Sequence, residues 1–219
     1  MSTQVIYCSG PLFSPEEQAA MSRIARILEQ VGYGTFLPHR DGLETAVMAA
    51  MKRLGPPAST LGPVHRLVRR AIFALDVYQI VERCEALVFN MNGRVPDEGG
   101  VAEAAIAFST GRPVVLYKED ARSAFDGFDN PMVSGLSTEP APVGRTEDLP
   151  AAVERALHAG ARRATQARPD RRYPDHLSRV VDFGRTVSDL LERWRSLRSA
   201  SERPDALLEE LNRLASAER

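Results

Sequence analysis

The feature that most constrains the fold of this chain is a series of short apolar runs that alternate with helix-forming segments. Short apolar runs bounded by turn residues and separated by helical patterns are typical of buried strands in a parallel sheet. The sequence therefore predicts an α/β fold whose strands are joined by right-handed crossovers. The predicted strands cover residues 5–8, 34–38, 86–89 and 114–117, with a weaker fifth near residues 142–144.

The helical segments carry recognisable start signals. Ser14 is followed by Pro15 and two glutamates, and apolar residues then recur at helical spacing up to Val31. This is the pattern of a capped helix N-terminus. Asp76 could cap a short helix that runs to residue 81. Similar periodicity predicts further helices over residues 43–53, 64–75, 101–109 and 148–163.

These elements together predict a flavodoxin-like, doubly wound parallel sheet of about five strands, followed by a C-terminal helical extension. We expect an α/β domain over residues 1–163 and the extension over residues 164–219, with a basic linker near residues 162–172. The extension has two amphipathic stretches, whose apolar stripes must pack on the main domain or on another subunit. The loop over residues 119–145 is longer than usual connections, which predicts a function or mobility.

Composition narrows the classes of partner. The 219-residue chain has a formal net charge of -1, 43% hydrophobic and 26% charged residues, so nothing drives it toward nucleic acid polymers or membranes. No signal-peptide or membrane-span pattern is present, and we expect a cytoplasmic protein. Cys8 and Cys84 are expected to be buried thiols. The four histidines have no metal-ligand spacing, so we expect no metal and no cofactor.

Three acidic side chains occupy positions near the predicted third strand, where a doubly wound sheet binds its ligands. Asp76 precedes this strand, whereas Asp97 and Glu103 follow it in the loop and the next helix. The neighbours of Glu103 are small, and the nearby helix N-terminus favours a carboxylate anion. An exposed, ionised carboxylate is what nucleophilic attack on an anomeric carbon requires.

Each acid also has a simpler structural explanation. Asp76 could only cap a helix, Asp97 could only shape a turn, and Glu103 could be a solvated acid in the first turn of its helix. Spacing alone does not choose between these explanations and a catalytic site. Composition and periodicity do not identify a substrate.

Several motifs taken together resemble the nucleoside 2-deoxyribosyltransferase family. They occur in the same order as in that family and cover about residues 4 to 135, each at a predicted strand end or loop. The motifs are the string from Tyr7 to Phe13, the acid Asp76, the segment from Asp97 to Glu103 with Ala107, the run from Gly111 to Val115, and Asn130-Pro131-Met132.

The resemblance implies a role for each matching residue. Glu103 would be the nucleophile that forms a covalent glycosyl-enzyme intermediate, and Tyr7 would hydrogen-bond it into line. Asp76 and Asp97 would contact the base and help to protonate it. The other matching positions would bind substrate, with Asn130 and Met132 reaching into the site of a neighbouring subunit; they are Gly10, Phe13, Gly100, Asn130 and Met132.

The family likeness implies partners as well as residues. They would be a nucleoside or nucleotide, a free nucleobase, and further copies of the chain in a homodimer or higher homo-oligomer. Core packing remains an alternative role for Tyr7 and Met132. The sequence departs from the family pattern over Ala104–Ala107, over residues 41–70, and from Ala164 onward, which leaves base and sugar preference open.

Two other functions stay open at this stage. The first is an N-glycosidase that acts on nucleosides or nucleoside monophosphates, in which Ser9, Ser14 and Arg40 could hold a phosphate. The second is a nucleotide-sensing module that binds without turnover. The acids Asp76, Asp97 and Glu103 favour an enzyme, because pure binding needs no exposed nucleophile.

Overall fold

The computed structural model describes residues 3–44, 47, 63–122, 129–166, 173–196 and 204–217. The chain forms two compact units, each built from two stretches of sequence. The first unit contains Met1–Leu37 and Gln79–Arg172, and the second contains Pro38–Tyr78 and Tyr173–Arg219. The C-terminal helices thus share a unit with the segment that precedes residue 79.

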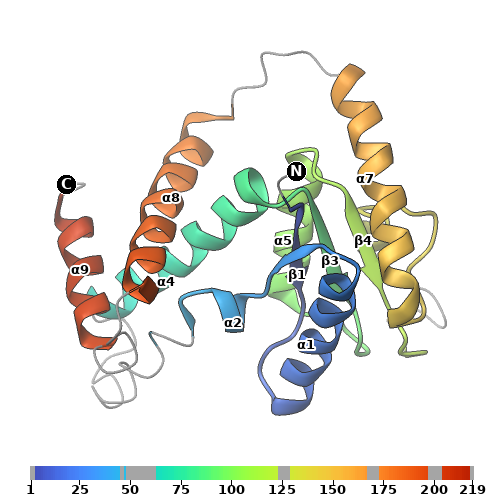
Figure 1. Cartoon of the computed structure of the whole chain (residues 1–219), viewed down its shortest axis with the longest axis horizontal. Helices are drawn as coiled ribbons and strands as arrows, with labels where there is room; N and C mark the ends of the chain where they lie inside the picture. The colour runs from blue at the N-terminus through green and yellow to red at the C-terminus, as the bar shows by residue number, and fades with distance from the viewer. Residues whose placement is uncertain are drawn as a thin grey trace. The chain divides into compact units, whose positions relative to one another are not determined.

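The first unit contains the predicted parallel sheet. Its strands are β1 (Val5–Ser9), β2 (Gly34–Phe36), β3 (Ala86–Asn90) and β4 (Val114–Tyr117), in the order β2-β1-β3-β4 (Figure 1). All the pairs are parallel, and the strand order reverses between β1 and β3. In sheets of this kind, ligands bind at that point, outside the carboxyl ends of the strands.

The predicted fifth strand is absent from the described residues. Val143 forms only an isolated parallel bridge with Tyr117, so the segment near residues 142–144 runs beside β4 without becoming a strand. The sheet of the described residues therefore has four strands. The α/β, doubly wound class is otherwise confirmed.

Helices cover both faces of this sheet. On one face, Ile6 and Cys8 of β1 pack with α1 (Pro15–Gln30) and α7 (Leu149–Gln166) in the main apolar core. Residues alternate between the two faces along a strand, so Tyr7 and Ser9 point to the opposite face. That face is covered by α5 (Glu98–Ser109), which follows β3.

The ends of two helices follow from their sequences. Ser14 caps α1 through a capping box with Glu17, as the pattern predicted. By contrast, α5 begins at Glu98, three residues before the predicted start, because Asp97 supplies its N-cap. Shorter segments complete this unit: the π-helix η1 (Gln79–Arg83), the single turn α6 (Pro131–Ser134) and the 3₁₀ turn η2 (Thr146–Asp148).

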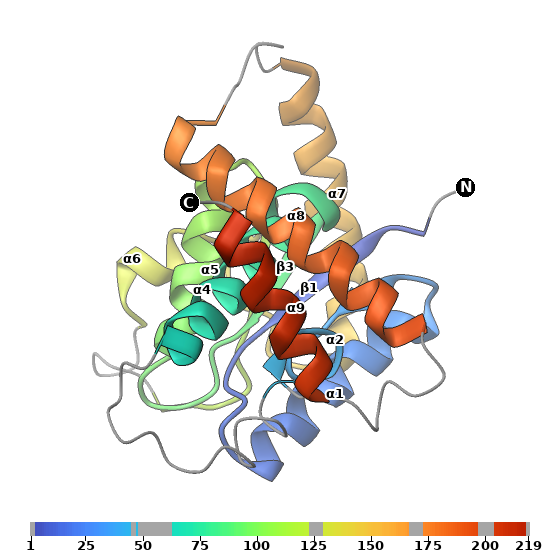
Figure 2. The ribbon, with the colours of Figure 1, turned by 90° about the vertical axis from the view of Figure 1, so that its left-hand side faces the viewer.

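The second unit is helical. It contains the short α2 (Pro38–Asp41) and three long helices, α4 (Pro63–Tyr78), α8 (Asp175–Ser196) and α9 (Pro204–Ala217). Figures 1 and 2 both show these long helices next to one another. The two amphipathic tail helices are thus confirmed, and most of the helix predicted over residues 43–53 lies outside the described residues.

The crossing of α4 and α8 depends on a glycine. A Cβ added to Gly184 would lie 1.9 Å from the carbonyl oxygen of Ala74, so only glycine allows the two backbones to approach this closely.

The structure corrects the prediction that Asp76 caps a new helix. The helix α4 continues through Asp76 to Tyr78, since its apolar face runs on without a break signal.

Two further observations concern the whole set of described residues. Cys8 and Cys84 are both free and buried, as expected, and burial raises the pKa of the Cys84 thiol well above its ordinary value. Within the same set, no helix combines the length and apolar character needed to cross a lipid bilayer.

Candidate active site

The candidate site is organised around the carboxylate of Glu103. The hydroxyl of Tyr7 donates a hydrogen bond to Oε1 of Glu103 at 2.8 Å, and the hydroxyl of Ser9 donates one to Oε2 at 2.5 Å. Both donors come from β1, two residues apart, so they share the face of the sheet that α5 covers. One strand therefore fixes the orientation of the whole carboxylate.

This geometry corrects the idea that Glu103 is a solvated acid in the first turn of a helix. Glu103 is half-buried, and α5 begins five residues earlier at Glu98, which places Glu103 in the second turn. The helix dipole acts mainly within the first turn. Hydrogen bonds donated by Tyr7 and Ser9 are therefore the nearer source of stabilisation for the anion.

Tyr7 is itself held by an aromatic neighbour that the sequence analysis missed. Phe36, the last residue of β2, stacks on the Tyr7 ring with the centroids 5.4 Å apart and the planes 23° from parallel. The two residues are direct partners in the parallel register of β1 and β2. The only sequence signal was the position of Phe36 at a strand end, and the register was needed to interpret it. Tyr7 is fully buried, so it also packs in the core.

Asp97 has a clear structural role at the start of α5. Its Oδ2 accepts a hydrogen bond from the backbone N–H of Gly100 at 2.7 Å, which makes it the N-cap of the helix. Gly100 is buried, and a Cβ there would lie 2.2 Å from the Phe89 ring, so glycine lets α5 approach β3. Asp97 and Gly100 thus position the helix that carries Glu103.

Gly10 and Asn90 bring the ends of β1 and β3 together. Gly10 has a φ of 153°, and a Cβ there would meet Cβ of Asn90 at 2.9 Å and the sulfur of Met21 at 2.8 Å. Asn90 is buried at the end of β3, where its Oδ1 accepts from the N–H of Asn92. Gly10 is therefore required for the close approach of these two strand ends.

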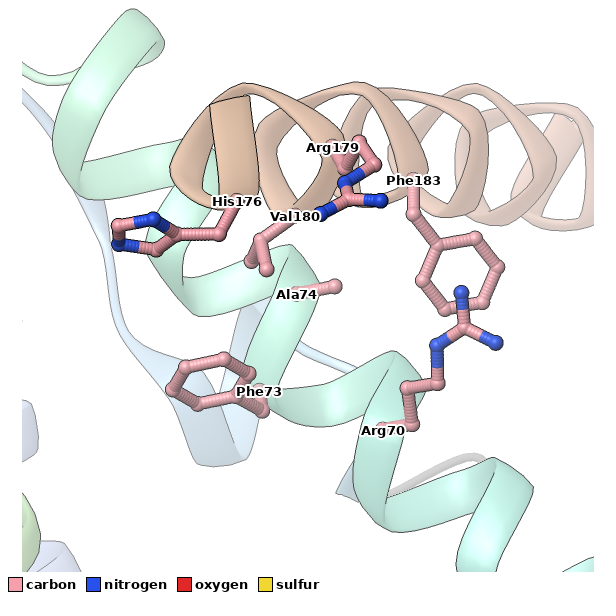
Figure 3. A pocket seen from close by; sticks show the side chains of 7 residues that line it. All are labelled: Arg70, Phe73, Ala74, His176, Arg179, Val180 and Phe183. Carbon is pink, nitrogen blue, oxygen red and sulfur yellow. The ribbon is translucent and has the colours of Figure 1, made fainter. Parts of the chain in front are cut away.

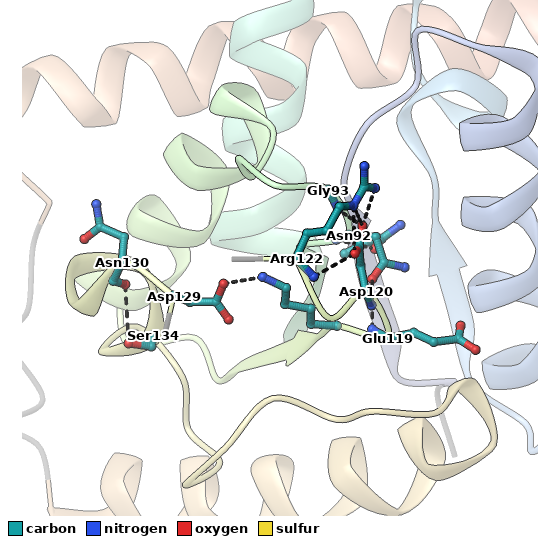
Figure 4. A network of polar contacts seen from close by, with 10 residues as sticks. Asn92, Gly93, Glu119, Asp120, Arg122, Asp129, Asn130 and Ser134 are labelled. Carbon is teal, nitrogen blue, oxygen red and sulfur yellow. Dashed lines mark hydrogen bonds and ion pairs between the residues drawn. The ribbon is translucent and has the colours of Figure 1, made fainter. Parts of the chain in front are cut away.

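A polar network joins the loops that follow β3 and β4 (Figure 4). Oδ1 of Asn92 accepts from the N–H groups of Glu119 and Asp120, and Asp120 accepts from the N–H of Gly93 at 3.1 Å. Hydrogen bonds from Arg122 hold the pKa of Asp120 well below its ordinary value. The network ties together two loops at the carboxyl edge of the sheet.

The same edge holds other charged and phenolic groups. The Tyr117 hydroxyl donates to Glu119 at 2.6 Å, and burial together with this bond raises the pKa of Tyr117 to about 12. Lys118 forms an ion pair with Asp129, which lies two residues before α6. These contacts anchor the chain on both sides of residues 123–128, which lie outside the described residues.

The remaining predicted ligand positions are spread over the surface and over the second unit. Asn130 caps α6 by accepting from the N–H of Met132, whose side chain is 80% exposed, and Phe13 is 85% exposed. The structure therefore does not place Met132 in the core. Asp76 is half-buried in the last turn of α4, in the second unit, and its role stays a prediction.

The residues considered for phosphate binding have other partners. Ser14 accepts from the N–H of Glu17 in the capping box, and Arg40 forms an ion pair with Asp41. Ser9 donates to Glu103. Within the described ranges, no cluster of three or more His, Cys, Asp or Glu residues forms a metal site, and the expectation of no metal stays a prediction.

Comparison with known proteins gives these contacts a family context. The model of the nucleoside 2-deoxyribosyltransferase family matches residues 6–141, which is more than half of the chain. The chain belongs to this family. Every residue of the Tyr7–Glu103–Ser9 set lies inside the matched segment. No curated protein sequence matches the chain significantly.

Several solved structures are similar to the chain, and they include the following three. A conserved protein from Enterococcus faecalis V583 is 19% identical with a TM-score of 0.51, and the match covers 70% of this chain and 99% of that one. The 2-deoxyribosyltransferases of Bacillus psychrosaccharolyticus and Leishmania mexicana are 18% and 15% identical, with TM-scores of 0.48 and 0.41. Those two matches cover 67% and 71% of this chain, and 90% and 97% of the others. At these identities, the Enterococcus structure supports the α/β fold alone.

Proposed function

We propose that this protein is a nucleoside 2-deoxyribosyltransferase that works through a covalent intermediate on Glu103. The observation that carries the proposal is the pair of hydrogen bonds from Tyr7 and Ser9 to the two oxygens of Glu103, at 2.8 and 2.5 Å. A carboxylate oxygen has two lone pairs, so an oxygen that accepts one of these bonds keeps a lone pair for attack. Membership of the family supports the same reaction class.

In the first half-reaction, an oxygen of Glu103 forms a bond to the anomeric carbon of the deoxyribose as the bond to the base nitrogen breaks. The electron pair of that bond leaves with the base, which takes up a proton. Positive charge develops on the sugar ring, and the oriented carboxylate stabilises it. The hydrogen bonds of Tyr7 and Ser9 hold Glu103 in one rotamer, so less ordering is needed at the transition state.

In the second half-reaction, a nitrogen of an incoming base attacks the same carbon as its bond to the Glu103 oxygen breaks. The proton of the attacking nitrogen goes to the group that protonated the first base. Two successive inversions retain the configuration of the substrate. Water in place of the base would give hydrolysis by the same route. The acceptor is therefore decided by how well a bound base excludes water from the intermediate.

Asp76 and Asp97 are proposed to contact the base. For Asp97, this role must be compatible with its hydrogen bond to the N–H of Gly100. The capping bond occupies Oδ2, so Oδ1 is the oxygen that we assign to the base. Asp76 and Asp97 would together help to protonate the departing base.

The test is a base-exchange assay with a matched variant. Purified protein is incubated with a deoxynucleoside and an excess of a different free base, and the products are separated by chromatography. Glu103→Ala should lower turnover by about three orders of magnitude or more, because the covalent route is lost. Glu98→Ala removes an exposed carboxylate from the same helix and should leave turnover unchanged.

The products separate the alternatives. Exchanged nucleoside supports the transferase. Free base and sugar at every base concentration, with no exchanged product, would replace it with the N-glycosidase. Binding of nucleosides without any turnover would indicate a sensing module, and near-normal turnover by folded Glu103→Ala would remove Glu103 from the mechanism.

A further inference from the structure

A second candidate site lies in the helical unit, in a groove between α4 and α8. The cavity has a volume of about 300 Å³, at the lower end of the usual range for small-molecule sites. Figure 3 shows the seven side chains that line it. They are Arg70, Phe73 and Ala74 of α4, and His176, Arg179, Val180 and Phe183 of α8.

The groove does not belong to the family site described above. The family match ends at residue 141, whereas α8 covers Asp175–Ser196 and supplies four of the seven lining residues. Neither Glu103 nor its hydrogen-bond donors line this groove. The inference is therefore independent of the proposed transferase activity.

The polar side chains that line the groove are all basic. Arg70, Arg179 and His176 carry or can carry positive charge, and the lining contains no carboxylate in the part of the chain that the structure describes. The guanidinium of Arg70 lies over the ring of Phe183, with Cζ 4.5 Å from the centroid. This cation–π contact holds one cation in place before any ligand binds. Guanidinium groups match the geometry of phosphate oxygens well.

Arg70 and the exposed aromatic ring of Phe73 lie at different ends of the groove (Figure 3). Arg70 lies at the end marked by Phe183, Phe73 and His176 lie at the other, and Arg179 lies between them with Ala74 and Val180. Phe73 is 54% exposed although it is a large apolar side chain. A ligand with an oxyanion at one end and a flat ring at the other would satisfy both ends.

We propose that this groove binds a nucleoside 5′-monophosphate, with the phosphate at Arg70 and Arg179 and the base against Phe73. A phosphate alone would not contact the aromatic end, and a nucleoside alone would carry no anion for the guanidinium groups of Arg70 and Arg179 to bind. A molecule of this class is also of a size that a cavity of about 300 Å³ can hold.

The experiment uses a ligand that the proposed activity cannot consume. Pseudouridine 5′-monophosphate has a carbon–carbon glycosidic bond, so it stays intact during a calorimetric titration of the full-length protein. Pseudouridine and inorganic phosphate are titrated in parallel. We expect the monophosphate to bind more tightly than either part, and Arg70→Gln and Arg179→Gln each to weaken its binding about tenfold or more.

Arg185→Gln is the matched control, because Arg185 is an exposed arginine on α8 that lies over the ring of Tyr78 and does not line the groove. It should leave the affinity unchanged. Arg70 and Arg179 are exposed, so their variants should fold. The proposal would be overturned if all three variants lost affinity equally, or if Arg70→Gln and Arg179→Gln left the affinity unchanged. It would also be overturned if inorganic phosphate bound as tightly as the monophosphate, or if the monophosphate did not bind at millimolar concentration.

Discussion

Ser9 is the residue whose role changed most between sequence and structure. Ser9 is fully buried in β1, and its Oγ lies 2.5 Å from Oε2 of Glu103. Tyr7, two residues earlier, takes the other oxygen. Because side chains alternate along a strand, Tyr7 and Ser9 lie on the same face of β1 and both donate to the carboxylate of Glu103.

A first prediction concerns these two donors. Tyr7→Phe and Ser9→Ala should each lower kcat about tenfold to a hundredfold, because hydrogen bonds to charged groups contribute about 1.5–3 kcal/mol. The effect should fall mainly on kcat, since a misoriented carboxylate affects attack more than substrate binding. Steady-state kinetics on a deoxynucleoside would measure it.

The control for this prediction is Ser109→Ala, which removes an exposed hydroxyl at the end of α5. It should leave both kinetic constants unchanged. If Tyr7→Phe and Ser9→Ala instead unfold the protein, as thermal denaturation would reveal, their role is structural. A folded double variant with the kcat of the wild type would exclude a positioning role for both residues.

At the scale of elements, α5 is the helix that places Glu103 beside the donors of β1. The helix starts where Asp97 caps it, approaches β3 closely at Gly100, and presents Glu103 one turn later to the face that carries Tyr7 and Ser9. The position of Glu103 therefore depends on where the helix begins. The cap residue Asp97 therefore helps to position Glu103, the proposed nucleophile.

A second prediction separates the cap from the proposed contact with the base. Asp97→Ala should lower the free energy of unfolding by about 1 kcal/mol, because the N–H of Gly100 loses its acceptor. Asp97→Asn keeps an oxygen that can cap the helix and should retain most of that stability. Chemical denaturation of both variants would measure the difference.

Turnover of the same two variants decides the functional role. If Asp97 only caps the helix, Asp97→Asn should remain close to wild type in kcat/KM. If Asp97 also contacts the base, Asp97→Asn should lose activity at nearly full stability. We expect the second result, and a fully active Asp97→Asn would remove Asp97 from the site.

At the scale of the whole molecule, the proposed site has a consequence for the oligomeric state. Met132 lies two residues after the cap residue Asn130, and its side chain is 80% exposed, so it is accessible to a neighbouring subunit. The resemblance to the family assigns Asn130 and Met132 to the site of a neighbouring subunit. An active site shared in this way would require an oligomer.

A third prediction follows for the state in solution. Light scattering should show at least a dimer, and Met132→Glu should shift it toward smaller species and reduce turnover together. Val31→Glu, which changes another exposed apolar residue at the end of α1, should change neither. A fully active monomer would remove Asn130 and Met132 from the list of site residues.

The sequence by itself determined most elements of the first unit, and it made Glu103 the candidate nucleophile. The four confirmed strands and the start of α1 follow from apolar runs, turn residues and a capping box, all of which act between residues close in the chain. The motif around Glu103 also lies within one segment. These features could be predicted because their physical causes are local.

The tertiary structure alone decided which residues meet. Ser9 and Glu103 are 94 positions apart in the sequence, and Phe36 faces Tyr7 only because β1 and β2 pair in a particular register. The weak segment near Val143 forms a single bridge instead of a strand, and α4 continues past Asp76. Such outcomes depend on packing and on pairing between distant segments. The free energy of these contacts cannot be inferred from a local sequence pattern.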